Sequence, residues 1–81
     1  MSPVTRSTHS AREHLAGNVR RLRLERGWSQ MRLAVLTDMH INTVGALERG
    51  QLNASIDVVE RIALAFEVPF GSLFEASAPQ P

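Results

Sequence analysis

Residues 28–50 have the sequence WSQMRLAVLTDMHINTVGALERG, and this stretch predicts two short helices joined by a tight turn. Ser29 can cap the first helix, expected over residues 30–37, because its hydroxyl can accept a hydrogen bond from a free amide of the first turn. Asp38 belongs to one of the few residue types besides glycine that tolerate a positive φ, so the turn is expected there. The second helix is expected over residues 41–49, and the glycine after it supplies its end.

A longer helix is expected before this stretch. Ser10 and Glu13 have the spacing of a capping box, in which the hydroxyl and the carboxylate each bind a free amide, so a helix should cover residues 11–26. Its buried stripe is expected at steps of three and four, at Leu15, Val19, Leu22 and Arg26.

Two further helices are expected after the central stretch. Ser55 can cap a helix over residues 56–66, whose apolar side chains make a broad face. Pro69 suits the first turn of a fifth helix over residues 70–75. Because no strand pattern appears in the sequence, these five helices predict an all-α fold.

The length allows one domain with one modest core, since the chain has 81 residues. This domain is expected over residues 10–75, with flexible segments at residues 1–9 and 76–81, where apolar residues are few. The sequence has no cysteine, so neither a disulfide nor a thiolate zinc site can support the core, and the cytoplasm is the expected compartment. The longest apolar run, residues 62–66, is far shorter than the roughly 20 residues that cross a bilayer.

The charge is distributed unevenly along the chain. The net charge is +1, but residues 1–49 carry eight arginines against four carboxylates, whereas residues 50–81 carry one arginine against four. All nine basic residues are arginines, whose planar guanidinium groups suit paired contacts with phosphates or guanine edges. A genome that favours arginine codons would explain the same composition.

The two short helices have the geometry that lets one helix lie across a DNA backbone while the next enters the major groove. Their residues match a known pattern, Ser29-Gln30-x-x-Leu33-Ala34 and Glu48-Arg49-Gly50, with further matches at Thr43, Val44, Ser55, Ile62, Ala63, Ala65 and Val68. Over residues 15–74 the chain resembles the Cro/repressor (Xre-type) helix-turn-helix family. This resemblance implies a compact five-helix Cro/repressor-like domain that binds double-stranded DNA, regulates transcription, associates with the nucleoid and has no enzyme activity, metal or cofactor.

Within that family the chain resembles the controller proteins of restriction-modification systems. The likeness lies in the small size, the absence of a ligand domain, Gly45 in the third helix and the run ERGQLNASI over residues 48–56. It implies an autoregulatory homodimer. Small prophage regulators and antitoxins of the same fold share nearly all of these features, so the alternative is such a protein acting mainly through a protein partner.

The resemblance implies that the third helix presents four residues to base edges, namely His40, Ile41, Asn42 and Ala46. Asn42 can pair with adenine, and Ile41 or Ala46 can contact a thymine methyl. Fewer of these side chains are polar than in the usual pattern, so specificity is expected to depend partly on DNA shape. For Gly45 and Ala46 the alternative is a close approach of the helix to the DNA backbone without base reading.

Six residues are implied to contact phosphates, namely Gln30, Arg32, Thr43, Arg49, Gln51 and Asn53. Their hydroxyl, amide and guanidinium groups can position a duplex without reading its sequence. Arg20 and Arg21 can add longer-range attraction, although a solvated arginine face explains them as well. Arg23 and Glu48 match positions that commonly form an internal salt bridge in this family, so both are interpreted as structural.

The last two predicted helices offer more apolar surface than one small core readily buries, and such a patch usually marks a partner surface. The residues expected at a homodimer interface are Ile56, Val59, Phe70 and Phe74, whereas Leu73 is expected in the core of the monomer. A twofold dimer would place two recognition helices about 34 Å apart and match a palindromic operator.

Other classes of function are disfavoured. The sequence lacks a nucleophile elbow, a phosphate-binding glycine loop and paired carboxylates, so neither an enzyme nor a small-molecule substrate is expected. His9, Glu13 and His14 are interpreted as surface residues rather than metal ligands. No helix combines a strongly basic face with an exposed aromatic one, which disfavours a membrane surface as partner. Activation of transcription would require a contact with RNA polymerase, for which the acidic residues of the fourth helix are candidates.

Overall fold

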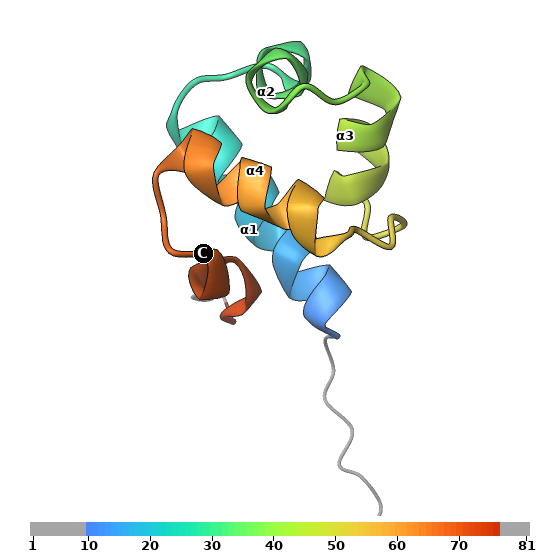
Figure 1. Ribbon diagram of the computed structural model, residues 1–81, viewed down its shortest axis with the longest axis vertical. Helices are drawn as coiled ribbons and strands as arrows, with labels where there is room; N and C mark the ends of the chain where they lie inside the picture. The colour runs from blue at the N-terminus through green and yellow to red at the C-terminus, as the bar shows by residue number, and fades with distance from the viewer. Residues whose placement is uncertain (1–9, 77–81) are drawn as a thin grey trace, which may run out of the picture.

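The computed structural model describes residues 10–76, and the expected flexible segments lie outside the described residues apart from Ala76. Within this part the chain forms four α-helices, one 3-10 helix and no strand, in the order α1 (Ala11–Glu25), α2 (Gln30–Thr37), α3 (Ile41–Glu48), α4 (Ile56–Phe66) and η1 (Phe70–Phe74). Figure 1 shows α1 and α4 in the middle of the molecule, with α2 and α3 at one end and η1 at the other. None of the described helices has the length and the apolar character that a membrane crossing requires.

The helix boundaries follow the capping residues. The hydroxyls of Ser10, Ser29 and Ser55 each accept a hydrogen bond from the amide three residues later, and Ser10 completes a capping box with Glu13. Asp38 has the left-handed conformation predicted for the turn, with φ 56°. The starts of these three helices are therefore as predicted, while α1 and α3 each end one residue earlier than expected.

The predicted fifth helix over residues 70–75 is instead the 3-10 helix η1. The Ser72 amide donates to the Pro69 carbonyl oxygen at 3.0 Å, and the backbone of Glu75 is already extended. So short a segment has room for few i→i+4 hydrogen bonds, and Gly71 has a low preference for the α-helix, so the tighter i→i+3 pattern forms. The prediction of five helices is therefore corrected to four α-helices and one 3-10 helix.

The core is one cluster to which all five elements contribute. Its members are Leu15, Val19, Leu22, Leu33, Ala34, Val44, Leu47, Val59, Ile62, Ala63, Phe66 and Leu73. The predicted stripe of α1 is wrong at its last member, because Arg26 is exposed and Arg23 is buried in its place. Arg26 covers the core from outside, since its guanidinium lies 5.1 Å from the Phe66 ring centroid and donates to the Phe66 carbonyl oxygen at 2.7 Å.

Polar side chains of α1 hold η1 in place. The buried Asn18 amide donates to the Leu73 carbonyl oxygen at 2.8 Å. His14, expected at the surface, is half-buried, and its Nδ1 lies 3.2 Å from the Phe74 carbonyl oxygen. His9 lies outside the described residues. Among residues 10–76, no group of histidine and acidic side chains is placed to hold a metal ion.

Candidate nucleic-acid interface

The unit formed by α2, its turn and α3 is held in a fixed shape. The Met39 amide donates to the Ala34 carbonyl oxygen at 2.9 Å and closes the turn. From α4, Arg61 Nη1 donates to the carbonyl oxygens of Thr37 and Asp38 at 3.2 and 3.3 Å. The inner sides of α2 and α3 are buried in the core, so their outer sides are presented to solvent in a defined arrangement.

His40 and Asn42 lie exposed at the N-terminal end of α3. His40 is the N-cap of this helix, and its Nδ1 accepts a hydrogen bond from the Asn42 backbone amide at 3.0 Å. In a neutral ring this places the proton on Nε2, which can donate to an acceptor outside the protein. The sequence reading missed the capping role, although an accepting side chain directly before a helix is a signal for it.

The other residues expected at base edges are less available. Ile41 is half-buried and packs against the core, which corrects the fully outward position expected for it. Ala46 is also half-buried. Gly45 is covered by Arg49, because a Cβ built on Gly45 would lie 3.1 Å from Arg49 Nη1. The exposed hydrogen-bonding side chains expected at base edges are therefore concentrated at the N-terminal end of α3.

A polar pocket of about 180 Å³ is lined by residues of α1, α2, the C-terminal half of α3 and the C-cap residue of α3. Its lining residues are Arg20, Arg23, Gln30, Gly45, Glu48 and Arg49. Gln30 Nε2 donates to Glu48 Oε1 at 3.1 Å, and Arg49 Nε donates to Gln51 Oε1 at 3.0 Å, so both side chains are held in place. Three guanidinium groups against one carboxylate give the pocket an excess of positive charge, which suits an anion.

Arg23 and Glu48 form a salt bridge within this pocket. Arg23 Nε and Nη2 donate to Glu48 Oε2 and Oε1 at 2.6 and 3.0 Å, and Nη1 donates to the Trp28 carbonyl oxygen at 2.8 Å. The two side chains are only 11% and 4% exposed, so the pair is shielded from water. The hydrogen bonds from Arg23 to Glu48 raise the pKa of Arg23 above its ordinary value; burial opposes this rise, and the charge of Glu48 adds to it. The pair links α1 to α3 and serves the fold.

The other residues expected at phosphates do not all gather at the pocket. Arg32 is exposed on α2, and Thr43 is half-buried on α3. Gln51 is exposed and joins the pocket through its hydrogen bond with Arg49. Asn53 is exposed at a different place, the edge of an apolar cleft.

Arg20, expected only to add longer-range attraction, lies at the polar pocket. It lines the polar pocket, whereas Arg21 forms an ion pair with Glu25 at 3.1 Å outside the pocket lining. The sequence has no signal that separates these two arginines. The rotation of α1 that buries its apolar stripe decides which of them lies at the pocket.

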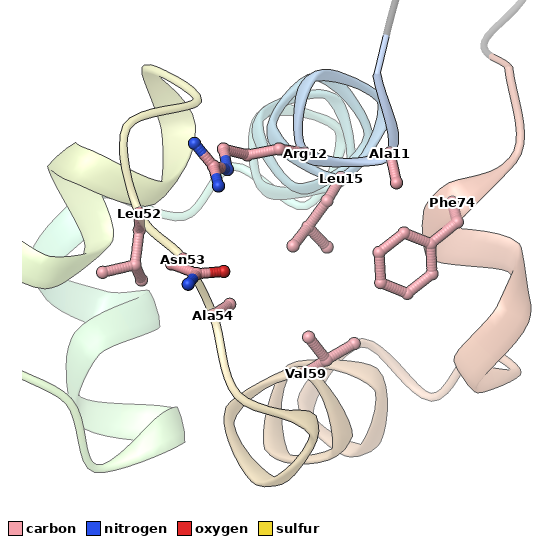
Figure 2. Close-up of a pocket in the computed structure, with 8 residues that line it drawn as sticks. All are labelled: Ala11, Arg12, Leu15, Leu52, Asn53, Ala54, Val59 and Phe74. Atoms are coloured by element: carbon pink, nitrogen blue, oxygen red, sulfur yellow. The ribbon is translucent and has the colours of Figure 1, made fainter. Parts of the chain in front are cut away.

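The apolar cleft has a volume of about 230 Å³ and is lined by residues of α1, α4, η1 and the loop before α4. Figure 2 shows Leu15, Val59 and Phe74 pointing into it from three different elements, with Arg12 and Asn53 toward the loop. The cleft thus reaches down to side chains of the core, since Leu15 and Val59 are each only 3% exposed.

Three of the four residues expected at a dimer interface reach the surface. Ile56 is 72% exposed and Phe70 is 41% exposed, while Phe74 is half-buried with its ring centroid 5.8 Å from that of Phe70. Val59 is only 3% exposed and belongs to the core, which corrects its assignment to the interface. The reason is its place on the inner face of α4, one turn before Ile62 and Ala63, which are also buried.

Comparisons with known sequences agree on one family. The sequence model described as a helix-turn-helix domain matches residues 14–76. The HTH-type transcriptional regulator SutR of Escherichia coli (strain K12) is 33% identical over 66 residues, which are 82% of this chain and 36% of that protein. The chain therefore spans about a third of the length of this curated relative.

Solved structures show the same fold over most of the chain. The hypothetical transcription factor NHTF from Neisseria superposes with a TM-score of 0.81 at 29% identity, covering 94% of this chain and 87% of that one. The restriction-modification controller protein C.AhdI from Aeromonas hydrophila superposes with a TM-score of 0.76 at 32% identity, covering 82% of this chain and all of that one. Residues 14–76, which the family model matches, include the two short helices, the turn between them and the polar pocket, and the chain belongs to the helix-turn-helix domain family.

Proposed function

We propose that this protein is a homodimeric DNA-binding regulator of transcription that controls its own gene, in the manner of a restriction-modification controller protein. The observation that carries the proposal is the polar pocket, to which α1, α2 and the C-cap residue of α3 each contribute a side-chain donor group. No catalytic role is proposed. The exposed acidic side chains Asp57 and Glu60 of α4 are the candidates for a contact with RNA polymerase.

Arg20, Gln30 and Arg49 are proposed to hold one phosphate of the DNA backbone. These side chains come from α1, α2 and the C-cap of α3, and they line one pocket with an excess of positive charge. Hydrogen bonds between a guanidinium group and a phosphate oxygen are charge-assisted and roughly twice as strong as neutral ones. Arg32 and Thr43, on α2 and α3, are proposed to contact neighbouring phosphates.

Base reading is proposed to depend on Asn42 and on Nε2 of His40. The Asn42 amide can donate and accept at once, which matches the major-groove edge of adenine. Ala46 and the exposed part of Ile41 can offer only apolar contact with a thymine methyl. With so few hydrogen-bonding groups on α3, sequence-dependent DNA shape is proposed to supply the rest of the specificity.

A second copy of the chain is proposed to pack around the apolar cleft. Ile56 follows the loop that lines the cleft, and Phe70 packs on Phe74, which points into it. Burial of this apolar surface against a partner is favourable by roughly 25 cal/mol per Å². A twofold axis at this face would set the two α3 helices for successive major grooves, about 34 Å apart, on a palindromic operator.

A gel-shift titration with DNA from immediately upstream of the protein's own gene tests the proposal. We expect binding tighter than about 1 μM, and weaker by at least about 10³-fold on an unrelated duplex of the same length. Equal and weak binding to every duplex would count against a sequence-specific regulator.

The second candidate function is that of an antitoxin acting mainly through a protein partner. The observation in its favour is the apolar outer side of α2, where Met31, Val35 and Leu36 are 53%, 67% and 42% exposed. Sequence-independent DNA binding, together with co-purification of a neighbouring gene's product that Val35→Glu abolishes, would favour this function over the first.

A further inference from the structure

Gly45 occupies the middle of α3, where a glycine weakens a helix relative to alanine. Its backbone does not require a glycine, because among the described glycines only Gly27 and Gly50 have a positive φ. The reason for a glycine must then lie in what a side chain would meet at this position.

A side chain at Gly45 would meet the guanidinium of Arg49. A Cβ built on Gly45 lies 3.1 Å from Arg49 Nη1 and 3.9 Å from Arg49 Cζ, and no other described atom comes within 4 Å apart from the helix's own backbone and the two neighbouring residues. The shorter separation is closer than the roughly 3.5–4.0 Å of an ordinary non-bonded contact between carbon atoms. A Cβ at this position would therefore require the guanidinium to shift by a few tenths of an ångström from its present place.

The position of this guanidinium matters because it completes the polar pocket. Arg49 Nε donates to Gln51 Oε1 at 3.0 Å, and Nη1 occupies the space that the missing side chain of Gly45 leaves open. In this position Arg49 lines the pocket together with Arg20 and Gln30.

We propose that Gly45 is a positioning residue for DNA binding, which lets Arg49 lie back along α3 and face a backbone phosphate together with Arg20 and Gln30. This inference rests on the proposed function and extends it to a residue that has no polar side chain of its own. It also explains why a glycine that weakens the helix occurs here: α3 loses some helix stability, but the Arg49 guanidinium is placed to face the phosphate.

Gly17 provides a matched control in the same protein. It also lies inside a helix, α1, where it is exposed, and a Cβ built on it meets nothing within 4 Å. Alanine has a higher helix preference than glycine, so Gly45→Ala and Gly17→Ala should both melt at or above the Tm of the wild type. Only Gly45→Ala should weaken DNA binding.

The experiment measures the affinity of both variants for the upstream DNA over a range of salt concentrations, in the wild-type chain and in the Arg49→Ala chain. We expect Gly45→Ala to lose about three- to tenfold in affinity, a part of what the loss of one charged hydrogen bond would give. Its salt dependence should also be shallower, because a phosphate contact is weakened. In the Arg49→Ala chain the same substitution should have no further effect.

Two results would overturn the proposal. An equal loss of affinity in both backgrounds would mean that the added methyl obstructs the DNA directly and does not act through Arg49. An unchanged affinity in both backgrounds would mean that the guanidinium does not need the open space at Gly45.

A measurement without DNA separates failure of this inference from failure of the proposed function. The Nε–H resonance of Arg49 reports its hydrogen bond to Gln51, and it should shift in Gly45→Ala but not in Gly17→Ala. An unmoved resonance overturns the positioning role even if the protein binds its operator. A shifted resonance in a protein that binds no DNA overturns the proposed function and with it the role in binding, while the link between Gly45 and Arg49 stands.

Discussion

Glu48 accepts hydrogen bonds from two side chains at once, those of Arg23 and Gln30. Removal of its carboxylate would leave the Arg23 guanidinium shielded from water and without a counter-charge. We therefore expect Glu48→Ala to lower the free energy of unfolding by about 3 kcal/mol in urea denaturation. Glu25→Ala, which breaks the solvent-exposed pair with Arg21, should change it by less than about 1 kcal/mol. Similar small effects of both substitutions would show that the buried pair is not a support of the fold.

The pKa of Arg23 sets the pH range over which the charged Arg23 side chain stabilises the fold. Hydrogen bonds to Glu48 raise that pKa above its ordinary value. A base whose pKa is raised by folding adds stability that is fully present below its unfolded pKa and is lost only as the pH rises through its folded pKa. We therefore expect no change in stability from Arg23 between about pH 6 and pH 10, measured by thermal unfolding of the wild type against the double variant Arg23→Met, Glu48→Met, which leaves no unpaired charge.

Asn42 allows the cleanest test of base reading on α3. Replacement of His40 would also remove a helix cap, whereas the Asn42 side chain has no capping role. We expect Asn42→Ala to reduce the discrimination between operator and random DNA by about 1–3 kcal/mol, the value of one amide–adenine contact. The matched control is Asn53→Ala at the apolar cleft, which should preserve it. If the ratio of affinities for operator and random DNA is unchanged in Asn42→Ala, this side chain does not read a base.

At the scale of residues, the sequence could predict side-chain types better than side-chain contacts. The pairing of Arg23 with Glu48 was implied by family resemblance, and the structure contains it. The cover of Gly45 by Arg49 could not be predicted, because it depends on the direction of a long side chain with several rotatable bonds. The choice of Arg20 as a pocket residue likewise depends on how α1 is rotated against the core.

The end of α4 makes a prediction at the scale of elements. Glu67 is its C-cap and adopts a left-handed conformation with φ 60° and ψ 45°. This conformation strains residues with a Cβ by roughly 1–2 kcal/mol, and a glycine would relieve that strain. Part of the relief is offset because glycine has greater conformational freedom in the unfolded chain. Glu67→Gly should therefore stabilise the protein by about 0.5–1 kcal/mol. The matched control is Glu60→Gly inside the same helix, which should destabilise it by about 1 kcal/mol. Calorimetry that shows both substitutions lowering the Tm would refute the left-handed cap.

The helix starts could be predicted closely, because α1, α2 and α4 each begin after a serine that caps them. The 3-10 form of η1 could not, since proline and aromatic residues at this spacing suit either kind of helix. Arg23 and Arg26 both lie near the edge of the apolar stripe of α1. Which of them is buried depends on a carboxylate supplied by α3, and periodicity within α1 carries no information about it.

The assembly of the whole molecule depends on the proposed dimer face. A carboxylate at position 56 would lose its hydration when the dimer forms, which opposes dimerisation. The same carboxylate is favourable at the first residue of a helix, so the monomer should still fold. We therefore expect Ile56→Glu to be a folded monomer. The matched control is Leu24→Glu, because Leu24 is 56% exposed on α1 and does not line the cleft. We expect the wild type and Leu24→Glu to sediment as dimers at micromolar concentration. Survival of the dimer in Ile56→Glu would place the interface elsewhere.

The residues of the proposed dimer face could be predicted only in part from the sequence. It predicted an excess of apolar residues in the last two elements, and Ile56 and Phe70 are indeed exposed. It could not separate these residues from Val59, because the side of α4 that meets α1 and η1 depends on the packing of three elements.

The salt dependence of operator affinity tests phosphate anchoring at the polar pocket most directly. Each cationic contact with a phosphate releases counterions, so the logarithm of the binding constant falls with the logarithm of salt concentration by about 0.9 per contact. Arg20, Arg32 and Arg49 of two protomers therefore predict a slope of about −5, which Arg49→Ala should make shallower by about 2. Arg21→Ala removes a charge outside the pocket lining and should leave the slope unchanged. A slope near zero, or one that is the same in Arg49→Ala as in the wild type, would contradict anchoring at this pocket.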